Sequence, residues 1–272
     1  MGAVAVTLKW SAVALLMTIS SAAAAQDAPA VRFCPNRPSL GASGCTTLPG
    51  QVQVELSGFD WQRDDDGETR EDLIRSEVTA RIGLTSNSEA QIAWTPLGTL
   101  RSRDKASGDV MRQTGAGDVT LGWRRALSHP DGKKLSTAVQ PYVTLPVGRS
   151  GIGEGDWSAG TVLPVFWRIN KKWSIDFTGQ LAAAVDEDGR GRHFDATGVF
   201  GVGYALTDSV TANAEVSVER DQDPAQHVVR TLAAASVAWK LTKRTQLDVL
   251  AVAGLNHDAP DARIALGGAL VF

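Results

Sequence analysis

The side chains that could support hydrolysis are four histidines and one serine–lysine pair. The histidines are His129, His193, His227 and His257. A Ser–His mechanism needs an imidazole within hydrogen-bond reach of the nucleophile, as in a barrel phospholipase. All four histidines are expected in turns or loops, and none is expected on a strand beside a serine. Ser102 and Lys105 have the Ser-x-x-Lys spacing of β-lactam-reactive enzymes, but no Lys-Thr-Gly sequence accompanies them. We expect no enzymatic activity and no catalytic residues; a barrel lipid hydrolase is the enzymatic alternative.

Three of the histidines neighbour acidic residues, and this combination can bind metal ions. The pairs are His193 near Asp195, His227 near Asp223, and His257 beside Asp258. Loops that brought these pairs together would hold a divalent cation, whereas separate solvated loops would bind surface cations only loosely. We expect the separate arrangement, and therefore no metal site and no cofactor.

Charged side chains recur at alternate positions of apolar segments. Arg75, Glu77 and Arg81, for example, oppose Ile74 and Val78. Charges of this kind cannot face lipid, so they must face a wet or mutually paired interior. Paired charges would brace and block a narrow barrel, while a basic wall opposite an acidic one would set a transverse field across an open pore. The expected lumen-lining residues are Arg75, Glu77, Arg81, Gln91, Arg124, Arg168, Asp176, Glu215, Arg230, Lys240 and Asp248.

About twelve segments between Gln51 and Phe272 alternate apolar and polar residues, which is the period of a β-strand. Short turns, near Asn87 and Asp131 for example, alternate with longer loops. This pattern predicts an all-β fold: a transmembrane antiparallel up-and-down β-barrel of about 12 strands with both termini periplasmic. The basic segment from Leu97 to Gly115 is expected to be an exterior loop, either folded into the mouth or bridging to lipopolysaccharide phosphates.

Aromatic residues fall on the apolar face near the short-turn ends of the predicted strands. Such residues form a girdle at a membrane interface. The girdle residues are Trp123, Trp167, Trp173, Tyr204, Trp239 and Phe272. The closing strand, which ends on Phe272, is expected to pair with the first strand and to be recognised by the barrel-assembly machinery. Outer-membrane lipid and lipopolysaccharide are the expected surroundings.

The first 25 residues have the pattern of a cleaved secretory signal peptide. Lys9 precedes an apolar run from Trp10 to Ile19, and Ala23 to Ala25 precede the expected cleavage site. Export leaves residues 26–49 as a periplasmic N-terminal segment and residues 50–272 as the barrel. The net charge of −3 and a pI near 5.8 give no basic surface for nucleic acid.

The two cysteines lie in the N-terminal segment, which is rich in Pro, Gly, Ser and Thr and has no strand or helix period. In an exported chain, Cys34 and Cys45 are expected to form a disulfide; a metal site or two reactive thiols are the alternatives. We expect the segment to be a periplasmic lead-in or a partial plug.

Several local sequences carry a family resemblance. They are Gly117–Gly122 (GDVTLG), Gln140–Gly148 (QPYVTLPVG), Gly155–Trp157 (GDW) and Ala253–Asn256 (AGLN). From about Cys34 to Phe272 the chain resembles Gram-negative outer-membrane proteins labelled "transporter", grouped as the "putative MetA-pathway of phenol degradation" family. The cysteine pair ahead of the first strand also fits that group. The resemblance implies an outer-membrane barrel that passes small, aromatic compounds, and it brings no defined binding residues.

These observations predict an outer-membrane channel or transporter for small solutes in a Gram-negative bacterium. The aromatic nature of the solute rests on the resemblance alone. The alternative is an occluded barrel that serves as a scaffold.

Overall fold

The alternating segments form the wall of a closed barrel in the structure, a computed structural model that describes residues 30–272. The predicted signal peptide, residues 1–25, lies outside the described residues. Val31–Phe272 form one compact unit. No helix in the described part of the chain is long and apolar enough to cross a membrane.

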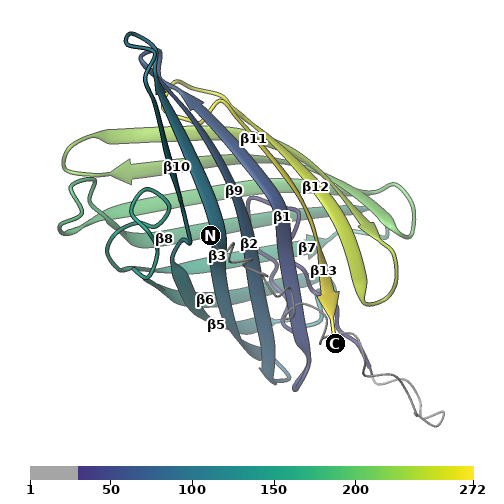
Figure 1. Cartoon of the computed structure of the whole chain (residues 1–272). Helices are drawn as coiled ribbons and strands as arrows, with labels where there is room; N and C mark the ends of the chain where they lie inside the picture. The colour runs from purple at the N-terminus through teal and green to yellow at the C-terminus, as the bar shows by residue number, and fades with distance from the viewer. Residues whose placement is uncertain (1–29) are drawn as a thin grey trace, which may run out of the picture. The chain divides into compact units, whose positions relative to one another are not determined.

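Twelve antiparallel strands close the ring, as predicted. A short additional strand pairs with the outer end of the third strand (Figure 1). The strands are β1 (Val52–Asp65), β2 (Thr69–Thr85), β3 (Ser88–Asp104), β4 (Val110–Gly115), β5 (Val119–Ser128), β6 (Leu135–Leu145), β7 (Ser158–Arg168), β8 (Trp173–Val185), β9 (Arg192–Ala205), β10 (Val210–Gln222), β11 (His227–Lys240), β12 (Thr245–Gly254) and β13 (Ala262–Val271). β1 pairs with β13, from Gln53↔Val271 to Arg63↔Ala262, so the ring has no open edge at its ends.

The prediction of a loop from Leu97 to Gly115 is wrong. β3 continues through Asp104 and returns as β4, with Arg103 opposite Val110 and Gly98 opposite Gly115. β5 pairs with β3 only from Ser88 to Trp94. The apolar period disappears in this hairpin because both of its faces are polar or solvated, whereas backbone pairing needs no apolar face in water. Loss of the period therefore marked the end of the apolar wall and not the end of the strand.

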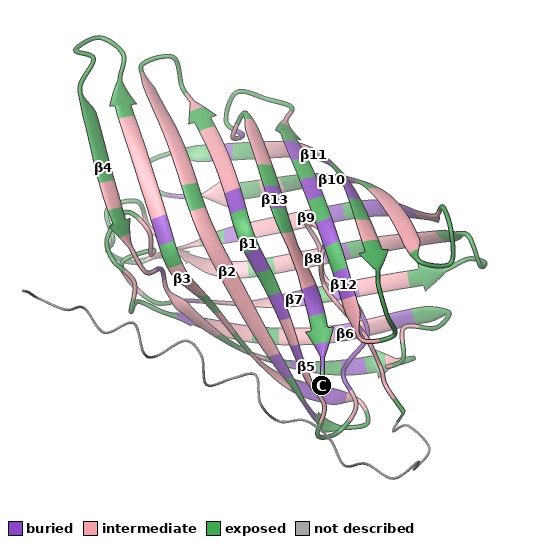
Figure 2. Ribbon diagram, turned by 45° about the vertical axis from the view of Figure 1, so that its right-hand side comes forward, coloured by how far each residue is buried: buried purple, intermediate pink, exposed green. Residues whose placement is uncertain are grey.

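Buried and exposed positions alternate along β12, as expected for a strand with one face inward and one outward (Figure 2). In β7 the exposed Leu163 and Trp167 alternate with the buried Val162 and Pro164. Trp157, just before β7, shares the outward face and lies ten residues from Trp167. Ten residues of strand span about 33 Å, or about 25 Å across a bilayer after the usual tilt. That height equals the apolar band of outer-membrane barrels.

Trp157 therefore belongs to a second row of outward aromatic side chains, at the end of the wall opposite the predicted girdle. Phe194 and Tyr204 repeat the ten-residue spacing on β9. Among the predicted girdle residues, Trp123, Trp167, Trp173, Trp239 and Phe272 expose 39–63% of their surface, and the Tyr204 ring centroid lies 4.6 Å from that of Trp173. Apolar side chains occupy the outer wall between the two rows, including Leu163 and Phe200.

Candidate functional site

The inward side chains surround a chain segment as well as solvent. Residues 31–49, called the plug segment below, cross the barrel interior. The Cys34 amide donates to Gln53 on β1 (3.0 Å), and the Ala42 amide donates to Thr178 on β8 (2.9 Å). The Ser236 hydroxyl of β11 donates to the Pro38 carbonyl (3.1 Å). Because these strands lie around the ring, the segment spans the interior from one wall to another.

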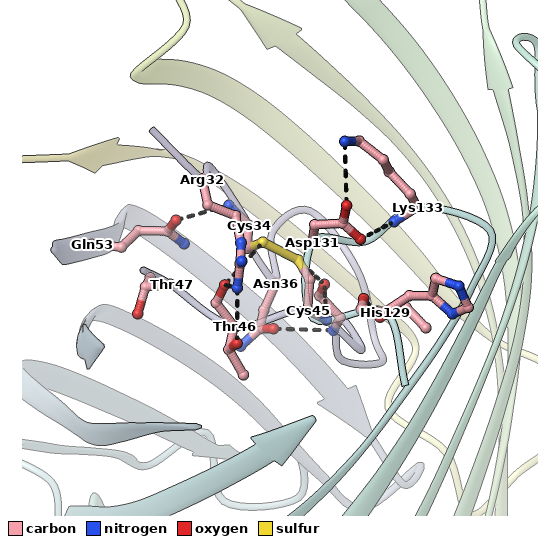
Figure 3. Close-up of a disulfide and its surroundings, with 12 residues drawn as sticks. Arg32, Cys34, Asn36, Cys45, Thr46, Thr47, Gln53, His129, Asp131 and Lys133 are labelled. Atoms are coloured by element: carbon pink, nitrogen blue, oxygen red, sulfur yellow. Dashed lines mark hydrogen bonds and ion pairs between the residues drawn. A yellow bond between two sulfur atoms is a disulfide. The ribbon is translucent and has the colours of Figure 1, made fainter. Parts of the chain in front are cut away.

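A disulfide closes the loop of the plug segment and confirms the predicted pairing of Cys34 with Cys45 (Figure 3). Both cysteines are buried. The Thr46 amide donates to the Pro130 carbonyl in the β5–β6 turn (3.0 Å), and Arg32 donates to the Ser86 carbonyl in the β2–β3 turn (3.0 Å). These contacts place the disulfide loop at the short-turn end of the barrel, where β2–β3, β5–β6 and the equivalent pairs connect.

A buried ion network joins the plug segment to the wall. Arg81, fully buried, lies 2.9 Å from Glu55 and 2.8 Å from Glu89, and Arg124 lies 3.6 Å from Glu89. Arg81 also donates to the carbonyls of Cys34 and Cys45, and Arg124 to the Cys45 carbonyl. Removing one member of such a network leaves a buried charge uncompensated, which costs about 3–5 kcal/mol. This region therefore has the paired arrangement that sequence reasoning left open.

Two cavities, of about 270 and 170 Å³, adjoin the plug segment. Asn36, Arg37, Pro38 and Ser39 line both cavities and thus form the partition between them. Arg37 holds the partition to the wall, because its Nη2 and Nε lie 2.8 and 3.2 Å from Asp248 Oδ1. It also donates to the Ser57 hydroxyl.

The larger cavity, on the short-turn side, combines aromatic rings with charged groups. Lys240 Nζ lies 5.9 Å from the centre of the Phe33 ring, and Arg168 Cζ lies 5.8 Å from that of Phe166. No ion pair involves Arg168 or Lys240 within residues 30–272. The predicted lumen residues Asp176 and Glu215 line the same cavity. Glu215 accepts a hydrogen bond from the Leu40 amide (3.2 Å).

Paired charges occupy the opposite half of the interior. Arg75 lies 3.1 Å from Glu77, and Arg263 binds Asp60 through both Nε and Nη2. Asp60 also lies 3.5 Å from Arg75. The remaining predicted lumen residues have acidic partners as well: Arg230 lies 3.0 Å from Asp221, and Gln91 donates to Glu89 (2.7 Å).

The loop between β6 and β7 packs onto the inner wall at the long-loop end. The Gly148 and Glu154 amides donate to Asp118 (2.7 and 2.6 Å), and Arg149 donates to the Ala116 carbonyl (2.8 Å). A Cβ atom at the buried Gly98 would come within 2.6 Å of the Ile152 side chain, so any other residue there would require Ile152 to move. Inward packing was one of the two alternatives considered for residues 97–115, and it is the β6–β7 loop that packs in this way.

The expectation that every histidine lies in a turn or loop is wrong for two of them. His193 belongs to β9, and His227 begins β11. His193 contacts Asp186, Asp221 and Asp223, whereas Asp195 was the acid noted beside it in the sequence. His257 is 84% exposed, 3.7 Å from Asp258. His193 of one pair and Asp223 of another therefore lie together, contrary to the expected separate arrangement, whereas His257 and Asp258 are not part of this cluster.

Sequence reasoning missed the partners of the inner arginines. Glu55 and Glu89 occupy alternate positions opposite apolar residues, so their spacing carried a usable signal. Arg37 carried none, because it lies in a Pro-rich segment without a period, 211 residues from Asp248.

Comparisons with solved structures support the fold. The crystal structure of the COG4313 outer membrane channel from Pseudomonas putida F1 aligns with a TM-score of 0.66 at 16% identity, covering 83% of this chain and 96% of that one. The NanC porin gives 0.53 at 10% identity (81% and 99%), and the CymD monoaromatic hydrocarbon channel gives 0.50 at 9% (82% and 88%). No curated protein sequence matched this chain. A family model matches residues 35–272, and the chain therefore belongs to the family described as "Putative MetA-pathway of phenol degradation".

Proposed function

We propose that this protein is a channel for small solutes in the outer membrane of a Gram-negative bacterium, narrowed by its own plug segment. The observation that carries the proposal is the pair of cavities on either side of Asn36–Ser39. A barrel that served only as a scaffold would gain stability by filling this space, since empty or hydrated volume forfeits packing contacts. Charged and polar side chains around both cavities would solvate a solute on its way through.

The proposed solute is a small aromatic compound, and one with a carboxylate is favoured. Phe33 and Phe166 offer ring faces in the larger cavity, and Arg168 and Lys240 beside them have no acidic partner among residues 30–272. The family is described by phenol degradation, and the similar CymD protein is a channel for monoaromatic hydrocarbons. Both descriptions are consistent with this solute class.

The membrane placement is part of the same proposal. The aromatic rows at Trp157 and Trp167 would lie at the two membrane interfaces, with the short-turn end in the periplasm. Residues 1–25 would direct export and be removed. The β13 strand ending near Phe272 would be read by the barrel-assembly machinery, and lipopolysaccharide would surround the long-loop end.

Planar-bilayer recordings on the full mature protein test conduction directly. We expect a small but measurable ion current that benzoate reduces more strongly than benzyl alcohol, since only benzoate carries a carboxylate for Arg168 and Lys240. Uptake of small aromatic and carboxylate compounds by a deletion strain, with and without the restored gene, gives the cellular counterpart. A wild-type protein that inserts but passes no ions, and a deletion strain with unchanged uptake, would refute the channel.

An occluded scaffold is the second candidate, and the buried network at Arg81 and Arg124 favours it. These two arginines are fully buried and bind the plug segment and the wall at once. A scaffold would remain silent in bilayers, yet conduct after residues 31–47 are deleted. A channel conducts in both forms.

A further inference from the structure

His193 lies in a side-chain cluster that the channel proposal does not use. β9 runs between β8 and β10 in the sheet, and acids at or just beyond the ends of both neighbouring strands approach the imidazole. Nδ1 lies 3.0 Å from Asp186 Oδ1 and 3.4 Å from Asp223 Oδ2, while Nε2 lies 2.9 Å from Asp221 Oδ1. The His193 side chain is only 6% exposed, and the three aspartates are 10–16% exposed.

A single hydrogen on His193 Nδ1 cannot donate fully to two carboxylates at once. Nδ1 carries at most one hydrogen, yet carboxylate oxygens of both Asp186 and Asp223 converge on it. Three carboxylates face a group that supplies at most one positive charge. Arg230 offsets Asp221 at 3.0 Å, but it also binds Glu219. The side of the cluster that faces Nδ1 therefore has excess negative charge in a largely buried place, which a cation would offset.

The spacing of the atoms fits a first-row divalent metal. Nδ1 and the two carboxylate oxygens all lie within 4.8 Å of one another. An ion with tetrahedral bonds of about 2.1 Å holds its ligand atoms about 3.4 Å apart. The Asp223 carboxylate is already oriented, because it accepts the amides of Glu187 (2.6 Å) and Ala225 (2.7 Å).

The other ring nitrogen has the partner that a metal-binding histidine needs. A ligating imidazole commonly donates its second N–H to a carboxylate, which fixes the ring and increases its basicity. Asp221 occupies this position at Nε2. The histidine also makes the cluster selective, since imidazole suits Zn²⁺ and similar ions whereas Ca²⁺ and Mg²⁺ prefer oxygen ligands alone.

We propose that His193 Nδ1, Asp186 and Asp223 form a Zn²⁺-type binding site, with Asp221 positioning the ring. The ion would tie the β8–β9 loop to the β10–β11 loop on the inner wall at the long-loop end. The site is independent of whether the barrel conducts. It was not expected from the sequence, because Asp186 and Asp223 lie 7 and 30 residues from His193, in loops on either side of it.

Equilibrium dialysis of the untagged mature protein against Zn²⁺, after treatment with a chelator, tests the site. We expect one Zn²⁺ per chain, with His193→Asn or Asp186→Asn abolishing that binding. Asp221→Asn should weaken it about 10- to 100-fold, the usual effect of losing a ring-orienting carboxylate. His257→Asn is the matched control and should change nothing, since that exposed histidine lies outside the cluster. Assembly of each variant is checked by its heat-dependent mobility on a gel.

Three results would overturn the site. The first is the absence of stoichiometric Zn²⁺ binding by the wild-type protein. The second is equal binding by wild type and an assembled His193→Asn or Asp186→Asn variant. The third is Ca²⁺ binding as tightly as Zn²⁺, which would show that the cluster binds cations without selecting Zn²⁺.

Discussion

Replacing Arg37 by alanine should loosen the partition between the two cavities. The side chain makes two contacts with Asp248, at 2.8 and 3.2 Å, and donates to Ser57. The Asp248 side chain is fully buried, so the substitution leaves an uncompensated carboxylate. Loss of such a pair costs about 3–5 kcal/mol, and we take about 3 kcal/mol because Arg37 is partly exposed. Displacement of Asn36–Ser39 should then become roughly 100-fold more frequent.

Single-channel recording measures this change. The Arg37→Ala protein should open more often or carry a larger current, and its reversal potential should shift toward cations because a negative charge is uncovered. Lys133→Ala is the control: Lys133 pairs with Asp131 but is 78% exposed, and exposed pairs contribute about 0–1 kcal/mol. An assembled Arg37→Ala protein with the current, opening frequency and selectivity of wild type would refute the reasoning.

The remaining predictions concern the wall, the disulfide and the terminus. Leu163→Arg, midway between the aromatic rows, should lower the free energy of unfolding in vesicles by about 2–4 kcal/mol. The matched change Leu206→Arg at the short-turn rim should cost only about 0–1 kcal/mol. Equal losses for the two variants in urea titrations would contradict the proposed membrane band. Converting both Cys34 and Cys45 to serine should raise the bilayer current, because the small loop they close contributes about 3 kcal/mol by restricting the unfolded segment. A current that does not respond to this change or to a reductant would show that the disulfide does not hold the plug segment. Deleting Phe272 should reduce the fraction of assembled protein in membrane extracts, and normal assembly would contradict a role in recognition.

Most of the wall could be predicted because its signals are local. A strand with one apolar face repeats every two residues, and tight turns such as that at Asn87 have recognisable residues. The predicted number of strands in the ring is confirmed for these reasons, and the predicted disulfide, which rested on the two nearby cysteines, is confirmed as well. The same rule failed between Leu97 and Gly115, where both faces of the β3–β4 hairpin are polar or solvated and no period remains.

The interior could not be predicted to the same degree. An inward polar residue has the same pattern whether it faces water, an ion pair or the plug segment, so Arg81 and Arg168 looked alike. Closure of the ring makes them different: Arg81 is fully buried against Glu55 and the plug segment, while Arg168 lies beside a cavity.

The sequence by itself determined a β-barrel with an apolar outer band, a polar interior and a disulfide ahead of its first strand. Period, turn residues and cysteine spacing are properties of neighbours along the chain. Only the tertiary structure decided that the disulfide loop lies inside the barrel, that Arg37 meets Asp248 there, and that His193 meets three aspartates from β10 and the two adjoining loops. Those contacts arise from the closure and register of the sheet, which bring together residues whose separation in the sequence carries no signal.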